Sequence, residues 1–305
     1  MSRIFDALQR SGTEQSGIEY PDMISVAMGV FEAPTQEPTP SPVEEQAPSI
    51  APVWDQHSVT PPPTEEPARG NLVFPSIEVS LTPSSRLVFF TQPESLAAEK
   101  LRFLGVRLRQ IRQTRPLKKV LVTSTIPEEG KSLISVNLAG VLARRNEKVL
   151  LIEGDLRRPV LAQHLGLGRL AGLAEWLQSG LETASNIYHL GGPGFYIMPA
   201  GAPPANTLEL MQSPRLSTLV EQLANLFDWI VVDSPPLLPL ADTTVWTRLT
   251  DGTLLVTRQG KTEKKTLQRG LEMIKKPDLL GVVLNSCTDA EHDNYYQRYS
   301  PPTTK

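Results

Sequence analysis

Cysteine and long apolar runs are scarce in this sequence, and no lysine occurs before Lys100. The 305 residues contain one cysteine, Cys287, which excludes an intramolecular disulfide and is typical of a reducing compartment. Because Cys287 ends an apolar run, we expect a buried thiol. No apolar stretch approaches the roughly 20 residues of a membrane-spanning helix, and residues 1–8 lack the apolar region of a secretory leader. We therefore expect a soluble chain that is made and kept inside the cell.

Charge and proline are unevenly distributed. Residues 1–88 carry 12 acidic and 4 basic side chains, a net charge of −8, and hold 13 of the 28 prolines. The remaining residues carry 21 acidic and 26 basic side chains, a net charge of +5. The sequence is thus an acidic segment joined to a mildly basic domain. Neither charge is large enough to predict a nucleic-acid partner.

Composition divides the chain into four segments. Residues 1–12 contain a short amphipathic helix, with Ile4, Phe5 and Leu8 on one face, which docks on a partner or frays. Residues 13–88 form a Pro-rich acidic linker, too poor in large apolar residues to offset chain entropy, and we expect disorder. Two β-like runs, 72–74 and 87–90, would form an edge element or a docked extended segment. Residues 89–288 form the folded domain and 289–305 a tail.

Strand and helix patterns alternate through the folded domain. Buried strands are expected at 119–124, 148–153, 195–199, 229–233, 253–257 and 281–285. Helices are expected at 93–112, 131–145, 158–165, 171–178, 207–212, 214–226, 241–248 and 262–275. This alternation is typical of an α/β protein with a doubly wound, mainly parallel sheet.

A phosphate-binding signature lies between the first strand and its helix. Gly130-Lys131-Ser132 opens the helix, where backbone N–H groups cradle phosphates, the lysine reaches the terminal phosphates and the serine hydroxyl holds a divalent metal. Thr125 stands where the common pattern G-x-x-x-x-G-K-[ST] has glycine. The alternative is an ordinary strand–helix turn. The expected nucleotide-binding residues here are Thr125, Pro127, Glu128, Glu129, Gly130, Lys131, Ser132 and Leu133.

Carboxylates end two further strands. Glu153 and Asp155 are two positions apart, which in extended chain places them on the same side. Such a pair suits Mg²⁺ coordination and acceptance of a hydroxyl proton; the alternative is a solvated turn paired with Arg157 and Arg158. Asp233 ends an apolar run, the usual place for a carboxylate that meets metal-bound water, and its alternative role is a helix N-cap.

Tyrosine is concentrated at the end of the chain. Tyr295, Tyr296 and Tyr299 are three of only six tyrosines and lie in a polar tail. They are expected to be exposed, modifiable hydroxyls that accept phosphate. The alternative is that they pack on the surface of the domain.

With these motifs assembled, the chain resembles the bacterial tyrosine kinases of polysaccharide biosynthesis, which are built on a MinD/ParA-like P-loop fold. The resemblance covers roughly residues 90–300. Its Walker A motif matches Ser124–Ser132, its Walker A′ motif Leu150–Arg158 and its Walker B motif Ile230–Pro236. The resemblance implies that Asn285 lies near adenine and that the tyrosine tail is the phosphoacceptor.

The chain departs from the family pattern at three positions. Glu128 stands where many members have glycine, and Glu153 stands where aspartate is usual. The E-x-x-R-x-x-R helix, which helps to close an oligomeric ring, matches at Glu99 and Arg102 but has Gly105 in the third place.

The resemblance also implies partners and a location. In such kinases a membrane-spanning polysaccharide co-polymerase supplies a cytoplasmic segment that completes the nucleotide site. We expect this activator as a separate chain, together with a homo-oligomer and a cognate tyrosine phosphatase. The protein would then be cytoplasmic and peripheral at the inner face of the cell membrane.

The sequence therefore predicts a protein-tyrosine autokinase that uses ATP and Mg²⁺ and regulates exopolysaccharide or capsule synthesis and export. One alternative is a MinD/ParA-like regulatory ATPase, although positions 124–126 lack the signature lysine of that group; another is a nucleotide-binding adaptor without kinase activity. The expected catalytic residues are Lys131, Glu153, Asp155 and Asp233, and the expected metal ligands are Ser132, Glu153, Asp155 and Asp233.

Overall fold

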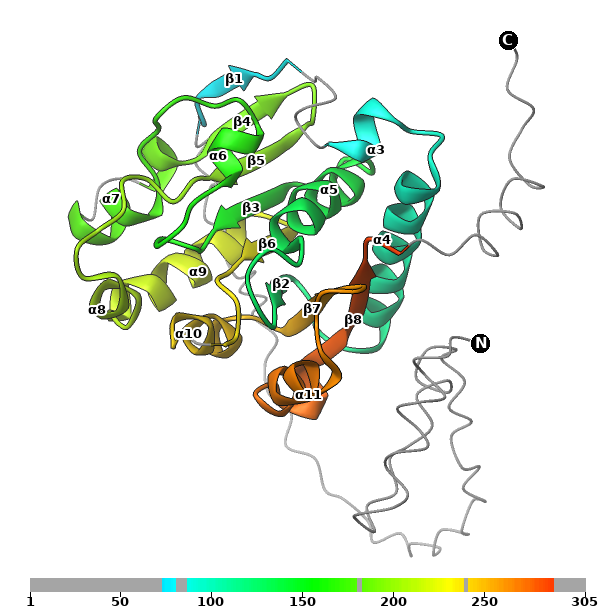
Figure 1. Ribbon diagram of the computed structural model, residues 1–305. Coiled ribbons are helices and arrows are strands. Elements are labelled where there is room, and N and C mark those ends of the chain that lie inside the picture. The colour runs from blue at the N-terminus through cyan, green and yellow to red at the C-terminus, as the bar shows by residue number, and fades with distance from the viewer. Residues whose placement is uncertain (1–72, 81–86, 180–182, 239–240, 288–305) are drawn as a thin grey trace, which may run out of the picture. The chain divides into compact units, whose positions relative to one another are not determined.

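The apolar runs become neighbouring strands of one sheet (Figure 1). The computed structural model describes residues 73–80, 87–179, 183–238 and 241–287. Within these ranges the sheet has eight strands in the order β1-β4-β5-β3-β6-β2-β7-β8. Neighbouring strands are parallel except β4 and β5, which are antiparallel. The strands are β1 (Ser76–Glu78), β2 (Lys119–Ser124), β3 (Val149–Glu153), β4 (Tyr188–Gly191), β5 (Phe195–Met198), β6 (Trp229–Asp233), β7 (Gly252–Arg258) and β8 (Leu279–Asn285).

Helices connect these strands, and the predicted doubly wound, mainly parallel α/β sheet is confirmed. Two short 3₁₀ helices, Thr183–Asn186 and Lys276–Asp278, complete the described elements. The α-helices are α3 (Val88–Thr91), α4 (Leu96–Thr114), α5 (Lys131–Ala143), α6 (Leu161–His164), α7 (Leu173–Ser179), α8 (Thr207–Met211), α9 (Pro214–Leu226), α10 (Asp242–Leu249) and α11 (Lys264–Glu272). The helix expected in residues 1–12 and the tyrosine tail lie outside the described residues.

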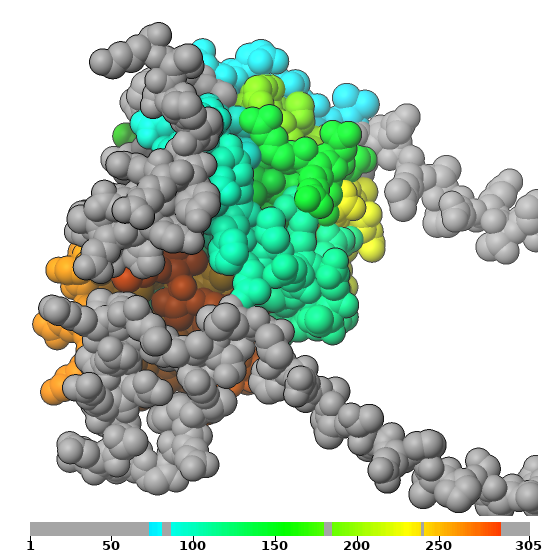
Figure 2. All heavy atoms as spheres, turned by 90° about the vertical axis from the view of Figure 1, so that its right-hand side faces the viewer, coloured from blue at the N-terminus to red at the C-terminus, as the bar shows by residue number. Residues whose placement is uncertain are grey.

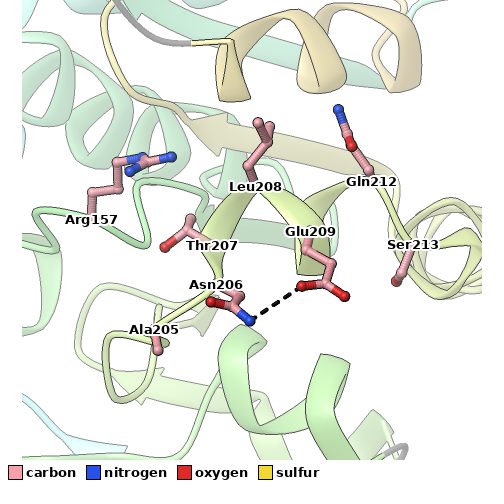
Figure 3. A pocket seen from close by; sticks show the side chains of 8 residues that line it. All are labelled: Arg157, Ala205, Asn206, Thr207, Leu208, Glu209, Gln212 and Ser213. Atoms are coloured by element: carbon pink, nitrogen blue, oxygen red, sulfur yellow. Dashed lines mark hydrogen bonds between the residues drawn. The ribbon is translucent and has the colours of Figure 1, made fainter.

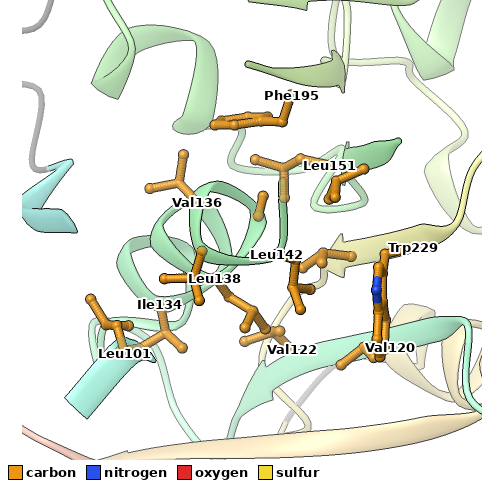
Figure 4. Close-up of a cluster of buried hydrophobic side chains, with 14 of the residues drawn as sticks. Leu101, Val120, Val122, Ile134, Val136, Leu138, Leu142, Leu151, Phe195 and Trp229 are labelled. Atoms are coloured by element: carbon orange, nitrogen blue, oxygen red, sulfur yellow. The ribbon is translucent and has the colours of Figure 1, made fainter. Parts of the chain in front are cut away.

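The two faces of the sheet carry separate apolar cores. In β2, Val120 and Val122 join the cluster beneath α4 and α5, whereas Leu121 joins the cluster beneath α7 and α9. Figure 4 shows the first cluster, in which side chains of α5 lie against β2 and β3. Successive strand residues point to opposite faces, so a continuously apolar run is what a strand covered on both sides requires.

The run at 87–90 is an exception to the strand pattern. It begins helix α3, so the expectation of an extended segment there was wrong. Phe89 donates its backbone N–H to Asn137 Oδ1 at 3.1 Å, and the Phe90 ring packs so closely on Gly140 that a Cβ there would lie 2.5 Å from it. These contacts with α5 override the β propensity of the two aromatic residues.

Gly105 has a packing role on α4. An added Cβ would lie 2.5 Å from Cγ1 of Val141 on α5, so the two helices approach closely at this glycine. Glu99 and Arg102, the other positions of the ring-helix pattern, form an ion pair of 2.8 Å at the surface. An arginine at position 105 would meet α5 within the domain, which is a physical reason for the departure from the pattern.

Strand β8 forms an edge of the sheet and is partly exposed. Figure 2 shows β8, in red-brown, reaching the surface beside α11, in orange. Val282 and Leu284 are 46% and 42% exposed. Cys287, just beyond the strand, is exposed rather than buried, so the expectation of a buried thiol was wrong. An apolar run predicts burial only when the strand is covered on both faces, and β8 is not.

Candidate active site

The three predicted motifs meet at one edge of the sheet. They follow β2, β3 and β6, which are adjacent and parallel. Asp233 pairs in register with Val122 on one side and with Glu153 on the other. Because parallel strands end at the same edge, residues far apart in the chain converge there, which is where open α/β sheets bind their ligands.

The loop between β2 and α5 has two left-handed backbone positions. Glu128 has φ = 66° and Gly130 has φ = 96°. Gly130 is the N-cap of α5 and brings no side chain to the first helical turn, whose N–H groups favour an anion. Glu129 is buried and its Oε2 accepts the Ile126 N–H at 2.8 Å. The loop is therefore shaped by its own carboxylate. Of the other predicted loop residues, Thr125 is buried, Leu133 is half-buried and Pro127 is exposed.

Lys131 lies between two buried carboxylates. Its Nζ is 3.4 Å from Asp155 Oδ2 and 3.7 Å from Asp233 Oδ2. Burial opposes the charge of the ammonium, but the two carboxylates outweigh burial and raise the pKa of Lys131. The lysine is thus held as a cation beside the loop, in the position that a phosphate-binding lysine requires.

Asp233 is fully buried and receives donors from two serines of α5. The Ser132 hydroxyl donates to Oδ2 at 2.6 Å and the Ser135 hydroxyl donates to Oδ1 at 3.0 Å. These donors and Lys131 favour the charged carboxylate, which burial disfavours. No helix begins beside Asp233, since the described residues 234–238 are non-helical, so the alternative role as an N-cap does not fit.

Glu153 and Asp155 have different partners. Glu153 Oε1 accepts the N–H groups of Val160 and Leu161, each at 2.5 Å, and its Oε2 accepts the Ala200 N–H at 3.1 Å. Burial raises the pKa of Glu153, and these three hydrogen bonds offset part of the effect. Asp155 instead meets Lys131 and the Arg158 N–H. The two side chains diverge because β3 ends at Glu153 and the alternation stops there.

The solvated-turn alternative for these carboxylates does not fit either. Glu153 and Asp155 are both buried, and Arg157 pairs with Asp242 at the start of α10, with Nε 2.6 Å from Oδ2. Asp242, by its hydrogen bond and charge, raises the pKa of Arg157. The pair ties the segment after Asp155 to the segment after β6.

An open groove of about 710 Å³ begins at Arg157 and runs along α8 (Figure 3). Its wall includes Asn206, Glu209 and Ser213, and Asn206 donates to Glu209 at 3.2 Å. Arg157 follows Asp155 by two positions, so the groove adjoins the segment that carries the predicted catalytic carboxylate.

The far side of the loop contacts the end of β8 and the segment that follows β7. Asn285 Nδ2 donates to the Glu129 carbonyl at 2.9 Å, and a Cβ on Gly130 would lie 2.0 Å from the same nitrogen. Lys261 Nζ lies 2.6 Å from Glu128 Oε2, and the Thr262 hydroxyl donates to Glu129 Oε1. Asn285 thus lies at the loop, as its predicted place near the nucleotide requires.

Sequence reasoning assigned no role to several residues of this site. Ser135 lies one helical turn after Ser132, a spacing that places both hydroxyls on one face and is a usable signal. Asp242 begins α10 after β6, and Lys261 and Thr262 follow β7. Their pairing with Arg157, Glu128 and Glu129 has no local signature.

The oxygen ligands near Lys131 fit Mg²⁺ bound together with a nucleotide. Ser132, Asp155 and Asp233 supply a hydroxyl and two carboxylates, the oxygen chemistry that Mg²⁺ prefers. Among the described residues no group of three or more His, Cys, Asp or Glu side chains forms a metal cage. Mg²⁺ at such sites relies on substrate phosphates and water for its remaining ligands, which this arrangement allows.

Comparison with known proteins agrees with this geometry. Residues 120–299 match the CobQ/CobB/MinD/ParA nucleotide binding domain. The chain is 33% identical over 216 residues to tyrosine-protein kinase YwqD of Bacillus subtilis, covering 68% of this chain and 89% of YwqD. It is 33% identical over 172 residues to tyrosine-protein kinase CpsD of Streptococcus pneumoniae, covering 55% of this chain and 76% of CpsD. The kinase domain of Escherichia coli tyrosine kinase ETK superposes with a TM-score of 0.62 at 28% identity, covering 67% of this chain and 82% of the ETK domain chain.

Proposed function

The chain belongs to the bacterial tyrosine-protein kinases built on the CobQ/CobB/MinD/ParA nucleotide binding domain, and we propose that it transfers the γ-phosphate of ATP to Tyr295, Tyr296 and Tyr299 of its own tail. The observation that carries this proposal is the buried arrangement of Lys131 between Asp155 and Asp233, with Ser132 bonded to Asp233. Phosphoryl transfer depends mainly on positioning and charge stabilisation, and this arrangement supplies both.

Each residue has a role in the proposed transfer. The α5 N-terminus and Lys131 would bind the β- and γ-phosphates, while Ser132 and Asp233 would hold Mg²⁺. Bound Mg²⁺ would neutralise charge on the phosphates. The tyrosine oxygen forms a bond to the γ-phosphorus, the bond from that phosphorus to the β–γ bridging oxygen breaks, and ADP leaves. The phenolic proton passes to a carboxylate.

Asp155 is the better placed of the two candidate proton acceptors. Its Oδ2 lies 3.4 Å from Lys131 Nζ, at the predicted phosphate position. Glu153 already accepts two backbone N–H groups at Oε1 and one at Oε2, so most of its acceptor capacity is used and less remains for catalysis or metal binding. We therefore assign Glu153 the task of holding residues 160–161 and 200 around the site.

The partners follow from the family. We propose that a membrane-spanning polysaccharide co-polymerase activates the enzyme through a cytoplasmic segment, that the tail is phosphorylated within a homo-oligomer, and that a tyrosine phosphatase resets it. None of the described helices combines the length and apolar character that crossing a membrane requires. We propose that the partner brings the enzyme to the membrane, in support of exopolysaccharide or capsule synthesis and export.

An anti-phosphotyrosine blot tests the proposal. Wild type, Lys131→Met and a Tyr295/Tyr296/Tyr299→Phe variant are incubated with Mg²⁺-ATP, with and without a co-polymerase cytoplasmic segment. We expect signal in wild type alone. Because Lys131 neutralises two buried carboxylates, its loss can destabilise the domain, so melting curves and a Ser132→Ala variant accompany the blot.

The outcomes separate the three candidate functions. Signal in Lys131→Met equal to that of wild type would refute the site assignment. ATP turnover without phosphotyrosine would indicate a regulatory ATPase, and nucleotide binding without turnover would indicate an adaptor.

A further inference from the structure

Glu128 is an unusual residue for the middle of a phosphate loop. Its backbone has φ = 66°, a left-handed conformation that glycine adopts freely and that costs other residues conformational energy. Its carboxylate adds a negative charge to a loop whose proposed ligand is a polyanion. The backbone conformation is a cost to folding, whereas the charge opposes nucleotide binding unless something compensates for it.

A cation from another loop meets that carboxylate. Lys261 Nζ lies 2.6 Å from Glu128 Oε2, and the two residues are 133 positions apart. The Glu128 side chain is 82% exposed and that of Lys261 is 32% exposed. The hydrogen bond and charge of Lys261, with smaller effects of Arg258 and Arg158, lower the pKa of Glu128. The carboxylate is therefore ionised at neutral pH, and Lys261 is the cation in contact with it.

The neighbouring contacts fix where Lys261 stands. Thr262, the next residue, donates to Glu129, and the Gln259 N–H donates to the Asn285 carbonyl at 3.0 Å. Asn285 in turn donates to the Glu129 carbonyl. The segment after β7 is thus attached to the loop on both sides of Lys261, which holds the ammonium at Glu128.

We propose that Lys261 is a positioning residue of the nucleotide site, which cancels the charge of Glu128 so that the loop accepts the phosphates of a nucleotide. The proposal rests on the proposed function only in taking a nucleotide di- or triphosphate as the ligand. Lys261 acts through Glu128 and not by touching the phosphates.

Two other roles for the pair predict different results. If Lys261 bound the phosphates directly, its loss would weaken binding whether or not Glu128 were charged. If the pair served only as a mechanical link, loss of either partner would weaken binding equally. Charge cancellation alone predicts that loss of Lys261 lowers the nucleotide affinity and that neutralising Glu128 in the same variant restores it.

The experiment is a double-mutant cycle read by calorimetric binding of Mg²⁺-ADP to the full chain. The variants are Lys261→Met, Glu128→Gln and their combination, and Lys265→Met removes the same charge from an exposed position of α11 as a matched control. We expect Lys261→Met to weaken binding about two- to five-fold at about 50 mM salt, with the difference shrinking at about 500 mM because salt screens exposed charges. Glu128→Gln should bind Mg²⁺-ADP at least as tightly as wild type. The affinity of the combined variant should be within about two-fold of the wild-type affinity, and the affinity of Lys265→Met should equal it.

Several results would overturn the inference. One is a combined variant whose affinity for Mg²⁺-ADP is as low as that of Lys261→Met. The others are a Glu128→Gln variant with lower affinity than wild type, or an Lys261→Met variant with wild-type affinity at low salt. Failure of wild type to bind Mg²⁺-ADP would remove the proposed function as well. Binding by wild type without the expected pattern would remove this inference alone, and a Glu128→Gly variant would then measure the backbone contribution separately.

Discussion

The hydroxyl of Ser132 donates a 2.6 Å hydrogen bond to Asp233 Oδ2, joining residues 101 positions apart in the chain. The bond links the phosphate loop to the end of β6. Under the proposed function, these two side chains would hold Mg²⁺, and the bond between them fixes their relative position, a condition for efficient charge stabilisation.

Asp233→Asn should separate catalysis from stability. Asparagine keeps the size of the side chain but removes a carboxylate that Lys131 and two serine hydroxyls contact, so we expect phosphotyrosine formation to fall at least about 100-fold. Because Lys131 keeps Asp155 as a partner, we expect the loss of stability to stay at about 1–3 kcal/mol, the cost of imperfect hydrogen bonding by the buried amide. Ser135→Ala is the control, because it removes only one donor to Asp233 and should cost about 1 kcal/mol of stability. A normal rate for Asp233→Asn would exclude it from metal binding.

Glu153→Gln should affect the fold more than the chemistry. The amide would place a donor against a backbone N–H that Glu153 now satisfies, which should cost about 1–3 kcal/mol of unfolding free energy. Mg²⁺-ADP affinity should change less than about two-fold, since its carboxylate binds backbone and not the loop. A large loss of affinity at full stability would restore Glu153 as a metal ligand.

The same variant should change the pH dependence of stability. Burial raises the pKa of Glu153 above its ordinary value of 4.5, so above pH 4.5 the folded state keeps a proton that the unfolded state has lost. The retained proton stabilises the folded state. This stabilisation is fully present below pH 4.5 and is lost across the pH window from 4.5 to the folded-state pKa of Glu153. The stability difference between wild type and Glu153→Gln should therefore shrink as pH rises through this window in denaturant titrations. A difference that grows with pH would show that the folded-state pKa is lowered.

Gly130→Ala should damage the loop in two ways. A methyl group is strained at φ = 96°, and it would lie 2.0 Å from Asn285 Nδ2. We expect a loss of about 1 kcal/mol or more of stability and weaker Mg²⁺-ADP binding, measured by melting and calorimetry. Gly168→Ala is a suitable comparison, because an added Cβ there meets nothing within 4 Å. Equal effects of the two substitutions would contradict this account.

Cys287 should react in the native state. Its exposure beyond the edge strand β8 predicts that a thiol reagent titrates one equivalent without denaturant, although its Sγ donates a hydrogen bond to the Leu284 carbonyl at 3.2 Å. Protection until unfolding would mean that another part of the chain covers it.

Local sequence patterns were sufficient to predict the regular part of the fold, in which buried strands alternate with helices. Continuous apolar runs identified β2, β3 and β6, and strand–helix alternation predicted a mainly parallel sheet. The strand order that brings Lys131, Asp155 and Asp233 together comes from the structure. Strand β4 was missed because it is four residues long and runs into the Gly-Gly-Pro-Gly turn before β5. Its place in the sheet is set by pairing with β1 and β5, which are distant or antiparallel partners.

Long-range contacts account for what the sequence could not predict in the site. The roles of Glu153 and Lys261 depend on which distant backbone or side chain each meets, Ala200 in one case and Glu128 in the other. Strand periodicity placed Glu153 beside Asp155, but the strand ends between them. Sequence periodicity therefore failed to predict side-chain direction at the point where the strand ends, and there the structure was needed.

The strand order has a further consequence for access to the enzyme. β1 and β8 occupy opposite edges of the eight-stranded sheet, so these two strands lie about 34 Å apart, at about 4.8 Å for each strand spacing. Under the proposed function, a partner that binds beside β1 and a partner that binds beside β8 would meet opposite edges of the sheet, with the nucleotide site between them.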